Sequence, residues 1–381
     1  MKLKIGLITL QGKKSLSAFE AYLKLINVIE AFSTEIVWVA TNYLGDERRL
    51  PANVALTKLE PKDTDGKPFI KRILHYLLRE MKIVLEIRKL RDIDVFIFYC
   101  GYVPLFPVLF TTLVLRRKTI LRTEGRSSIV LKSRMGPAAD LDNRLIRMIA
   151  HVLMEKVTYS LAHKIAVEYE SMVERFNLQK YRHKIALGNQ YVDTALFSKA
   201  KDLTKRTYQL GYFGRFSDEK GILEFAKSLP LILKDQKSKA IIVGEGELEG
   251  QIREILTDTN IQDKVELLGW IELDKMPAYL NDIRIVVVPS YGEGVPNIVV
   301  EAMACSTPIL ATSAGGIPDV IRDGETGFIM EDNSPECIAR NVIRVLNHPN
   351  LEEITANARA LVEKEYAYEV VVERYRNIVA S

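Results

Sequence analysis

The residues best suited to chemistry in this sequence are two carboxylates, Glu293 and Glu301, separated by seven residues within Ser290–Pro318. The chain between them is expected to turn into a helix after Gly294, with Pro296 in the first turn, where a missing N–H loses no hydrogen bond. The unpaired N–H groups and the dipole of a helix start favour a phosphate. Glu301 would lie about two turns below Glu293 on roughly the same face. One carboxylate could then meet a sugar near the phosphate and the other a ribose; the alternative is a core helix with two solvated Glu side chains.

A second group of residues suited to phosphate binding lies earlier in the chain. Gly214, Arg215, Lys220 and Gly221 follow an apolar, strand-like run. A strand that ends in glycine lets a ligand approach the backbone, and an Arg and a Lys on the following loop can clamp two phosphates. Two basic residues on a surface loop are common by chance, so this signal gains its weight from the two carboxylates downstream.

Short apolar runs that alternate with amphipathic segments must position these groups. The runs are near-continuous in Val, Ile and Leu, which is typical of parallel strands covered on both faces. The pattern predicts doubly wound α/β domains. The expected strands are Lys4–Leu10, Ile36–Thr41, Val54–Leu59, Val95–Tyr99, Thr119–Thr123, Lys164–Val167, Lys184–Leu187, Lys239–Gly244, Lys264–Gly269, Ile283–Pro289 and Ile309–Thr312.

Length and composition indicate two globular domains. The chain has 381 residues, of which 48% are hydrophobic and 27% charged; this length suits two cores better than one. Asn189 and Asp193 are turn formers that mark a boundary, and the polar stretch Ser198–Arg206 is the expected linker.

Several motifs carry a resemblance to a known family. GEGVPNIVVEAMA at 292–304, followed by PILAT and GGIP, resembles the E-x7-E element of the retaining family-4 glycosyltransferases, the glycosyl transferases group 1. Residues 214–221 match the G-R-x-x-x-x-K-G loop of that family. LGNQYVDTALF at 187–197 is similar to its N-G-V-D-x-x-x-F segment, with Gln190 and Tyr191 in place of a single residue.

The resemblance implies the GT-B architecture, in which two Rossmann-like doubly wound α/β domains face one another across a cleft. Residues 1–190 would form the acceptor domain and 205–360 the donor domain for a nucleotide diphosphate sugar linked to UDP, GDP or ADP. The last helix, 365–381, would pack back on the first domain. The acceptor would be a glycan or a lipid-linked sugar, in the synthesis of a lipid-linked glycan or a cell-surface polysaccharide.

The resemblance also implies roles for the site residues. Arg215 and Lys220 would neutralise the leaving diphosphate without a metal, Glu293 would accept hydrogen bonds from the transferred sugar, and Glu301 would hold the ribose. The N–H groups around Val295 and Asn297 would contact the phosphate and the sugar. Gly214, Gly244, Gly294 and Pro296 complete the expected nucleotide-binding set. The family retains the anomeric configuration, the departing phosphate takes the acceptor's proton, and no cofactor is implied.

The N-terminal half departs from the family pattern in two places. The loop after the first strand has one glycine, Gly12, where the family often has two. Where relatives often place a His, the chain has Glu124 and Arg126, which are candidates for contacts to the transferred sugar or the acceptor. We expect Glu124 to be the polar group of this domain that lies nearest to the transferred sugar or the acceptor.

Charge and apolar runs bear on location. Lys62–Lys156 holds 19 Lys and Arg against 10 Asp and Glu, a surplus of nine, whereas the whole chain is +4. This basic region could lie against anionic lipid, receive a phosphorylated acceptor, or be a solvated helix face.

Val95–Leu115 is expected to be a strand, a loop and a short helix rather than a transmembrane helix. The N-terminus suggests a first strand, not a signal peptide, and three separated cysteines suggest a reducing compartment. We therefore expect a cytoplasmic protein, with the inner face of the membrane as a possible site of action.

Other interpretations are weaker. A dinucleotide-binding fingerprint is suggested by Gly244, Gly246 and Gly250. Their spacing is G-x-G-x-x-x-G rather than G-x-G-x-x-G, and three glutamates there would repel a pyrophosphate. Three Asp-x-Asp pairs and five scattered histidines indicate no metal site. A basic region without an aromatic platform is not enough to indicate nucleic-acid binding. The competing functions are a nucleotide-sugar epimerase, a pyridoxal-phosphate-dependent phosphorylase and a catalytically silent nucleotide-sugar binding protein of the same fold.

Overall fold

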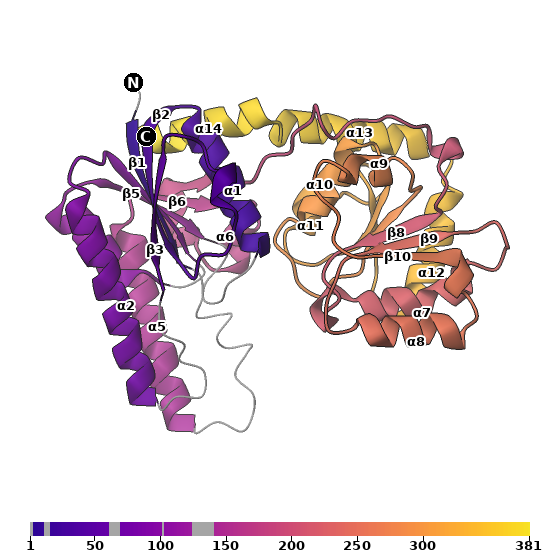
Figure 1. The fold of residues 1–381 in the computed structure, drawn as a ribbon, viewed down its shortest axis with the longest axis horizontal. Helices are drawn as coiled ribbons and strands as arrows, with labels where there is room; N and C mark the ends of the chain where they lie inside the picture. Colours follow the sequence, from indigo (N-terminus) through magenta and orange to yellow (C-terminus); the bar gives the residue numbers. More distant parts are fainter. Residues whose placement is uncertain (1–2, 11–15, 61–68, 101–102, 124–140) are drawn as a thin grey trace. The chain divides into compact units, whose positions relative to one another are not determined.

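The chain forms two compact α/β units in the computed structural model, which describes residues 3–10, 16–60, 69–100, 103–123 and 141–381. Unit 1 comprises Met1–Gln190 with Val371–Ser381, and unit 2 comprises Tyr191–Val370. Each unit is built on one parallel sheet with helices packed on it (Figure 1). These two sheets confirm the predicted doubly wound α/β class.

The sheet of unit 1 has the strand order β3-β2-β1-β4-β5-β6-β7. Its strands are β1 (Leu3–Leu10), β2 (Ser33–Thr41), β3 (Val54–Leu59), β4 (Val95–Cys100), β5 (Lys118–Thr123), β6 (Lys164–Val167) and β7 (Ile185–Leu187). Its helices are α1 (Leu16–Glu30), α2 (Phe69–Lys89), α3 (Leu105–Leu109), α5 (Leu141–Leu161), α6 (Met172–Arg175) and the end of α14 (Tyr368–Ala380). The sheet grows in one direction from β1 to β3 and in the other from β4 onward, so α1 lies on one face and α2 and α5 on the other (Figure 1).

The sheet of unit 2 repeats this plan with the order β10-β9-β8-β11-β12-β13. Its strands are β8 (Leu210–Phe213), β9 (Ala240–Val243), β10 (Val265–Leu268), β11 (Val286–Val288), β12 (Ile309–Thr312) and β13 (Phe328–Met330). Its helices are α7 (Ile222–Ile232), α8 (Glu249–Asp258), α9 (Met276–Leu280), α10 (Asn297–Ala304), α11 (Ile317–Val320), α12 (Pro335–Leu346) and α13 (Leu351–Glu365).

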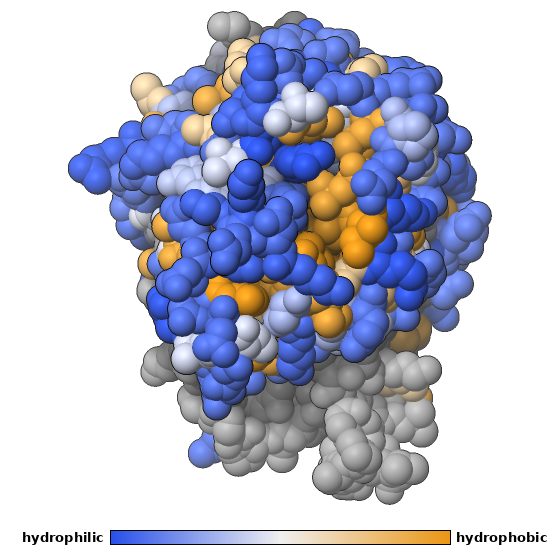
Figure 2. Space-filling view, turned by 90° about the vertical axis from the view of Figure 1, so that its right-hand side faces the viewer, coloured by the Kyte–Doolittle hydropathy of each residue, from blue (hydrophilic) through white to orange (hydrophobic). Residues whose placement is uncertain are grey.

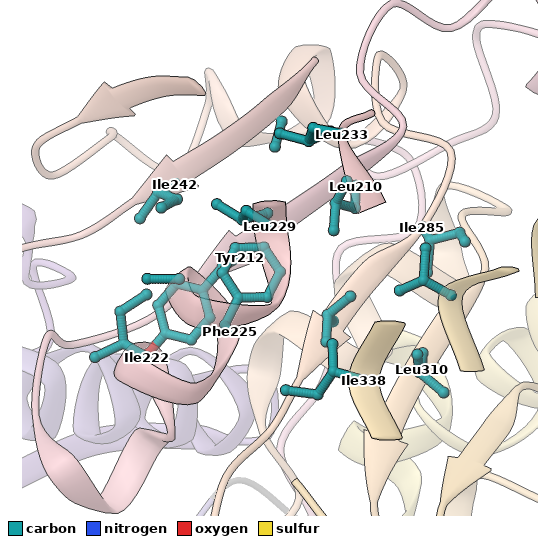
Figure 3. Packing of buried hydrophobic residues seen from close by; sticks show 14 of the residues in the cluster. Leu210, Tyr212, Ile222, Phe225, Leu229, Leu233, Ile242, Ile285, Leu310 and Ile338 are labelled. Carbon is teal, nitrogen blue, oxygen red and sulfur yellow. The ribbon is translucent and has the colours of Figure 1, made fainter. Parts of the chain in front are cut away.

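Side chains from strands and helices fill the core of unit 2. Figure 3 shows Leu210 and Tyr212 of β8 beside Phe225 and Leu229 of α7, and all four are buried. Full burial of a large apolar side chain contributes about 1.5–3 kcal/mol, so this cluster fixes α7 on the sheet. The surface shown in Figure 2 is mainly hydrophilic, with apolar side chains in limited areas.

The C-terminal helix α14 contributes to the core of unit 1. The Tyr375 hydroxyl donates to the Gly188 carbonyl at 2.9 Å and accepts a hydrogen bond from Arg122 Nε at 2.9 Å. Lys118 Nζ donates to the carbonyl of Val379 at 2.8 Å. Tyr375 is buried, so this end of the chain is held by polar contacts inside an apolar environment.

The long apolar run Val95–Leu115 is a strand followed by a short helix, as predicted. It forms β4 and then α3, which continues as the π-helical turn Phe110–Val114. Within the described ranges, no helix is both long and apolar enough to cross a membrane. Cys305 and Cys337 are free and buried.

Candidate active site

The predicted chemical groups of unit 2 follow two neighbouring strands that are far apart in sequence. Gly214 directly follows β8, and Glu293 lies in the loop after β11; β8 and β11 pair in the middle of the sheet. The strand order reverses at this pair. In open α/β sheets, ligands bind outside the carboxyl ends of strands at such a switch point.

Lys220 and Glu293 form an ion pair at this edge. Lys220 Nζ lies 2.6 Å from Glu293 Oε1, and the side chains are 21% and 10% exposed. Ser290 Oγ donates to the same oxygen at 2.7 Å. Among the described residues, Glu293 Oε2 has no hydrogen-bond partner. The carboxylate is therefore oriented by two donors while one oxygen can accept from a ligand.

Two glycines permit the backbone approach that brings these loops together. Gly221 has φ +66°, and a Cβ there would lie 2.1 Å from the Pro289 carbonyl oxygen. Gly315 has φ +60°, and a Cβ there would lie 1.7 Å from the Glu293 carbonyl oxygen. No other residue type fits either position without movement of the backbone. Gly221 belongs to the loop motif, whereas the role of Gly315 was not predicted.

Gly244 also lies close to the site, where its lack of a side chain lets two loops pack against each other. Its φ is +144°, and a Cβ would lie 1.9 Å from the carbonyl oxygen of Gly214. Its N–H donates to the Leu268 carbonyl at 3.1 Å. Gly244 therefore allows the loop after β9 to pass directly beside the loop after β8.

Arg215 is held through its backbone, while its guanidinium is exposed. The Tyr212 hydroxyl donates to the Arg215 carbonyl at 2.9 Å. Burial, and secondarily the charge of Glu293, raises the pKa of Tyr212 well above its ordinary value, so the phenol remains a donor. The guanidinium pairs with Glu219 at 2.5 Å, and both side chains are more than half exposed. Such exposed pairs contribute little to stability, so Arg215 can exchange Glu219 for an anionic ligand.

Helix α10 begins later than the sequence suggested. Pro296 is its N-cap, with φ −63° and ψ 133°, and Asn297 is its first residue; the prediction that Pro296 lies in the first turn was wrong. The extended ψ of Pro296 and the restriction that proline imposes on Val295 keep both outside the helix. The N–H groups of Asn297 and Ile298 open the helix and have no acceptor within it.

Glu301 is a buried carboxylate in the second turn of α10. It is 5% exposed. Because the helix begins at Asn297, only about one turn separates its start from Glu301, and the expected separation of two turns from Glu293 was wrong. Glu293 lies before the helix, in the loop that Gly315 supports.

Two arginines hold the far end of α10, and the sequence analysis missed both. Arg359 Nη1 donates to the carbonyls of Ala304 and Phe197, each at 2.5 Å. Arg206 is buried and donates from Nη2 to the Cys305 carbonyl at 3.2 Å. Burial lowers the pKa of Arg206 to about 10, so the guanidinium stays charged at neutral pH. The partners are main-chain carbonyls distant in sequence, so no motif could reveal these contacts.

Three candidates from the N-terminal half, Gly12, Glu124 and Arg126, lie outside the described residues. In the part of the chain that is described, no group of three or more His, Cys, Asp and Glu side chains could hold a metal ion.

Comparison with known proteins identifies the domain that carries this site. The sequence profile of the family described as Glycosyl transferases group 1 matches residues 207–348. These residues belong to the group 1 glycosyl transferases, and we call residues 207–348 the group 1 domain. The match includes Arg215, Lys220, Glu293 and Glu301 of the group 1 domain, and it confirms the resemblance at this level.

Curated relatives extend the likeness beyond the group 1 domain. The capsular polysaccharide biosynthesis glycosyltransferase CapM of Staphylococcus aureus is 29% identical over 246 residues, which are 59% of this chain and 63% of CapM. The N-acetyl-alpha-D-glucosaminyl L-malate synthase of Bacillus anthracis is 26% identical over 226 residues, 56% of this chain and 58% of that protein. The chain spans about half the length of the curated relatives it matches.

A solved structure shares the fold over the whole chain. HepE of Anabaena, crystallised in complex with UDP, has a TM-score of 0.74 at 16% identity, covering 100% of both chains. This likeness confirms the predicted GT-B fold class, with two Rossmann-like α/β domains.

Proposed function

We propose that this protein is a retaining glycosyltransferase that moves a sugar from a nucleotide diphosphate sugar to an acceptor hydroxyl without a metal ion. Residues 205–360 would form the donor domain and residues 1–190 the acceptor domain. The observation that carries the proposal is the convergence of Lys220, Glu293 and the start of α10 beyond the switch point of the group 1 domain.

The charges of the site suit a diphosphate leaving group. Lys220 has one carboxylate partner and two further ammonium hydrogens, and the guanidinium of Arg215 lies in an exposed pair with Glu219. Both cations can turn toward a diphosphate as negative charge develops on it. The first N–H groups of α10, at Asn297 and Ile298, add donors for a phosphate oxygen. Val295, Pro296, Gly294 and Gly214 would line the same donor site, with Gly244 supporting it.

The two carboxylates take different parts of the donor. Glu293 Oε2 would accept from a hydroxyl of the transferred sugar, and Glu301 would hold the ribose. In the reaction, the bond from the anomeric carbon to the phosphate oxygen breaks and a bond from the acceptor oxygen to that carbon forms on the same face. The proton of the acceptor hydroxyl passes to the departing phosphate oxygen. This route retains the configuration and needs no enzymic nucleophile.

The acceptor belongs to glycan assembly in this proposal. CapM is named for capsular polysaccharide biosynthesis, and a further relative in Corynebacterium glutamicum is named as a mannosyltransferase acting on a phosphatidylinositol mannoside. We infer a glycan or lipid-linked sugar acceptor, met in the cytoplasm at the inner face of the membrane. Glu124, Arg126 and Gly12 remain candidates for contacts from the acceptor domain.

The test is donor binding followed by transfer. Thermal unfolding with UDP-, GDP- and ADP-sugars should show a higher midpoint with the matching donor, because only the native state binds it. Transfer with that donor should continue in the presence of EDTA, and NMR of the product should show retained configuration. An inverted product, or turnover abolished by EDTA and restored by a divalent metal, would overturn the corresponding part of the proposal.

The same assay separates the competing functions. An epimerase should turn over the donor, and release free nucleotide diphosphate, without any acceptor. A silent binding protein should show the midpoint shift with no turnover for any acceptor. Absence of a shift with every nucleotide sugar would overturn all three interpretations.

A further inference from the structure

Exposed apolar side chains are concentrated on a small part of unit 1. Sixteen large hydrophobic residues are exposed among those described, and ten of them lie on α2, α5 and the turn Phe110–Val114. Helices α2 and α5 both pack against α3, and Figure 1 shows them extending together beyond the sheet. Single exposed apolar residues need no explanation, but a concentration of this kind marks an interaction surface.

Helix α2 is apolar on two opposite faces. Leu74, Leu78, Met81 and Leu85 recur at helical spacing on one face, and each is 48–52% exposed. The other face is buried and includes Ile83 and Ile87. The buried face accounts for the attachment of α2 to unit 1. The exposed face, which we call the α2 outer face, has no partner within the described chain.

The α2 outer face carries positive charge at its side. Exposed Lys71 and Lys82 lie about 50–70° around the helix axis from the apolar line. The helix has only two acidic residues: Glu80, which is buried and accepts a hydrogen bond from the Phe106 N–H, and Glu86, which pairs with Lys89 at 2.8 Å. The exposed apolar line is thus bordered by lysines, and both carboxylates of the helix are otherwise engaged.

We propose that the α2 outer face docks on an anionic lipid bilayer. An apolar stripe with lysines beside it is the arrangement by which a helix lies in a membrane interface, and each lysine near an anionic surface adds to the attraction. A second copy of the chain is a poorer occupant, because a two-fold contact would bring the same lysines of both copies to one interface. This inference rests on the proposed function in one respect: it names the surface on which the lipid-linked acceptor is met.

The experiment is vesicle co-sedimentation of the full chain. We expect binding to vesicles of phosphatidylglycerol and phosphatidylcholine in equal parts, and at least about tenfold weaker binding to pure phosphatidylcholine. The double variant Leu78→Glu/Leu85→Glu should lose binding by about tenfold or more. Lys82→Gln should lower it about fivefold on anionic vesicles and leave binding to neutral vesicles unchanged.

The matched control is Ile343→Glu on α12, because Ile343 is 51% exposed, like Leu78 at 52%, but belongs to unit 2. It should bind vesicles as the wild type does. If the double variant does not fold by circular dichroism, Leu78→Gln replaces it. Failure of the wild type to bind anionic vesicles, or undiminished binding by the α2 variants, would overturn the proposal. So would a concentration-dependent dimer that the α2 variants abolish. Donor hydrolysis measured without vesicles tests the proposed function separately, because no α2 residue lies in unit 2.

Discussion

Lys220 and Glu293 lie 73 residues apart in the sequence, and their side chains meet with Nζ 2.6 Å from Oε1. The pair joins the loop after β8 to the loop after β11. Each group is charged and mostly buried, so each neutralises the other until a ligand arrives. In a donor complex, Lys220 would interact with the diphosphate and Glu293 with the sugar.

Substitution of either partner should reduce transfer strongly. We expect Lys220→Ala and Glu293→Gln each to lower kcat/KM about 10²–10³-fold, because each removes a preorganised charge from the reacting centre. The double variant should lose less than the product of the two factors, since the groups interact directly. Lys227→Ala, an exposed lysine on α7, is the control and should match the wild type. Wild-type rates in Glu293→Gln would contradict this assignment.

Gly315 should tolerate no side chain. Gly315→Ala places a methyl group 1.7 Å from the Glu293 carbonyl oxygen and also requires a positive φ, so we expect a loss of about 3 kcal/mol or more in the free energy of unfolding. Gly324→Ala is the matched control, with φ +76° and nothing within 4 Å; it should lose only about 1 kcal/mol. Denaturant unfolding measures both. Equal losses would show that the contact with Glu293 is unimportant.

Arg359 should stabilise unit 2 through the end of α10. Arg359→Met removes donors from the carbonyls of Ala304 and Phe197 and should lower the free energy of unfolding by about 2–4 kcal/mol. Arg253→Met removes an exposed ion pair with Glu249 and should cost less than about 1 kcal/mol. Urea unfolding of the two variants tests the difference. A loss in Arg359→Met no larger than in Arg253→Met would show that these carbonyl contacts do not support α10.

Glu80 should make stability depend on pH. Burial raises the pKa of Glu80 to about 7, from 4.5, so between these values the folded state binds more protons than the unfolded state. Stability contributed by this group is therefore present below about pH 4.5 and is lost as the pH rises through 7. Glu80→Gln should remove this slope and stabilise the protein above pH 7 by on the order of 2 kcal/mol.

Thermal unfolding across this pH range checks the Glu80 prediction. Glu86→Gln is the control, because Glu86 lies on the same helix in an ion pair with Lys89, and it should keep the slope. A Glu80→Gln variant with the wild-type pH profile would contradict the prediction.

The sequence by itself determined the class of fold and the candidate residues of unit 2. Near-continuous apolar runs predict buried parallel strands wherever they occur, so β3, β6 and β12 have the predicted bounds. The spacing of glycine, lysine and glutamate within the two motifs indicated Lys220 and Glu293 as candidates. Residue type and spacing are local properties, so the sequence alone is enough to read them. The expected strand Ile283–Pro289 shortened to Val286–Val288, because Ile283 forms only an isolated bridge with Tyr208.

Only the tertiary structure decided how these residues meet. The pairing of Lys220 with Glu293 requires β8 to lie beside β11, and the late start of α10 depends on the extended backbone of Pro296. The hold of Arg206 and Arg359 on the end of α10 uses main-chain carbonyls, which every residue possesses. A sequence pattern records side-chain type and spacing, so it cannot record which backbone groups the fold brings within reach of a guanidinium.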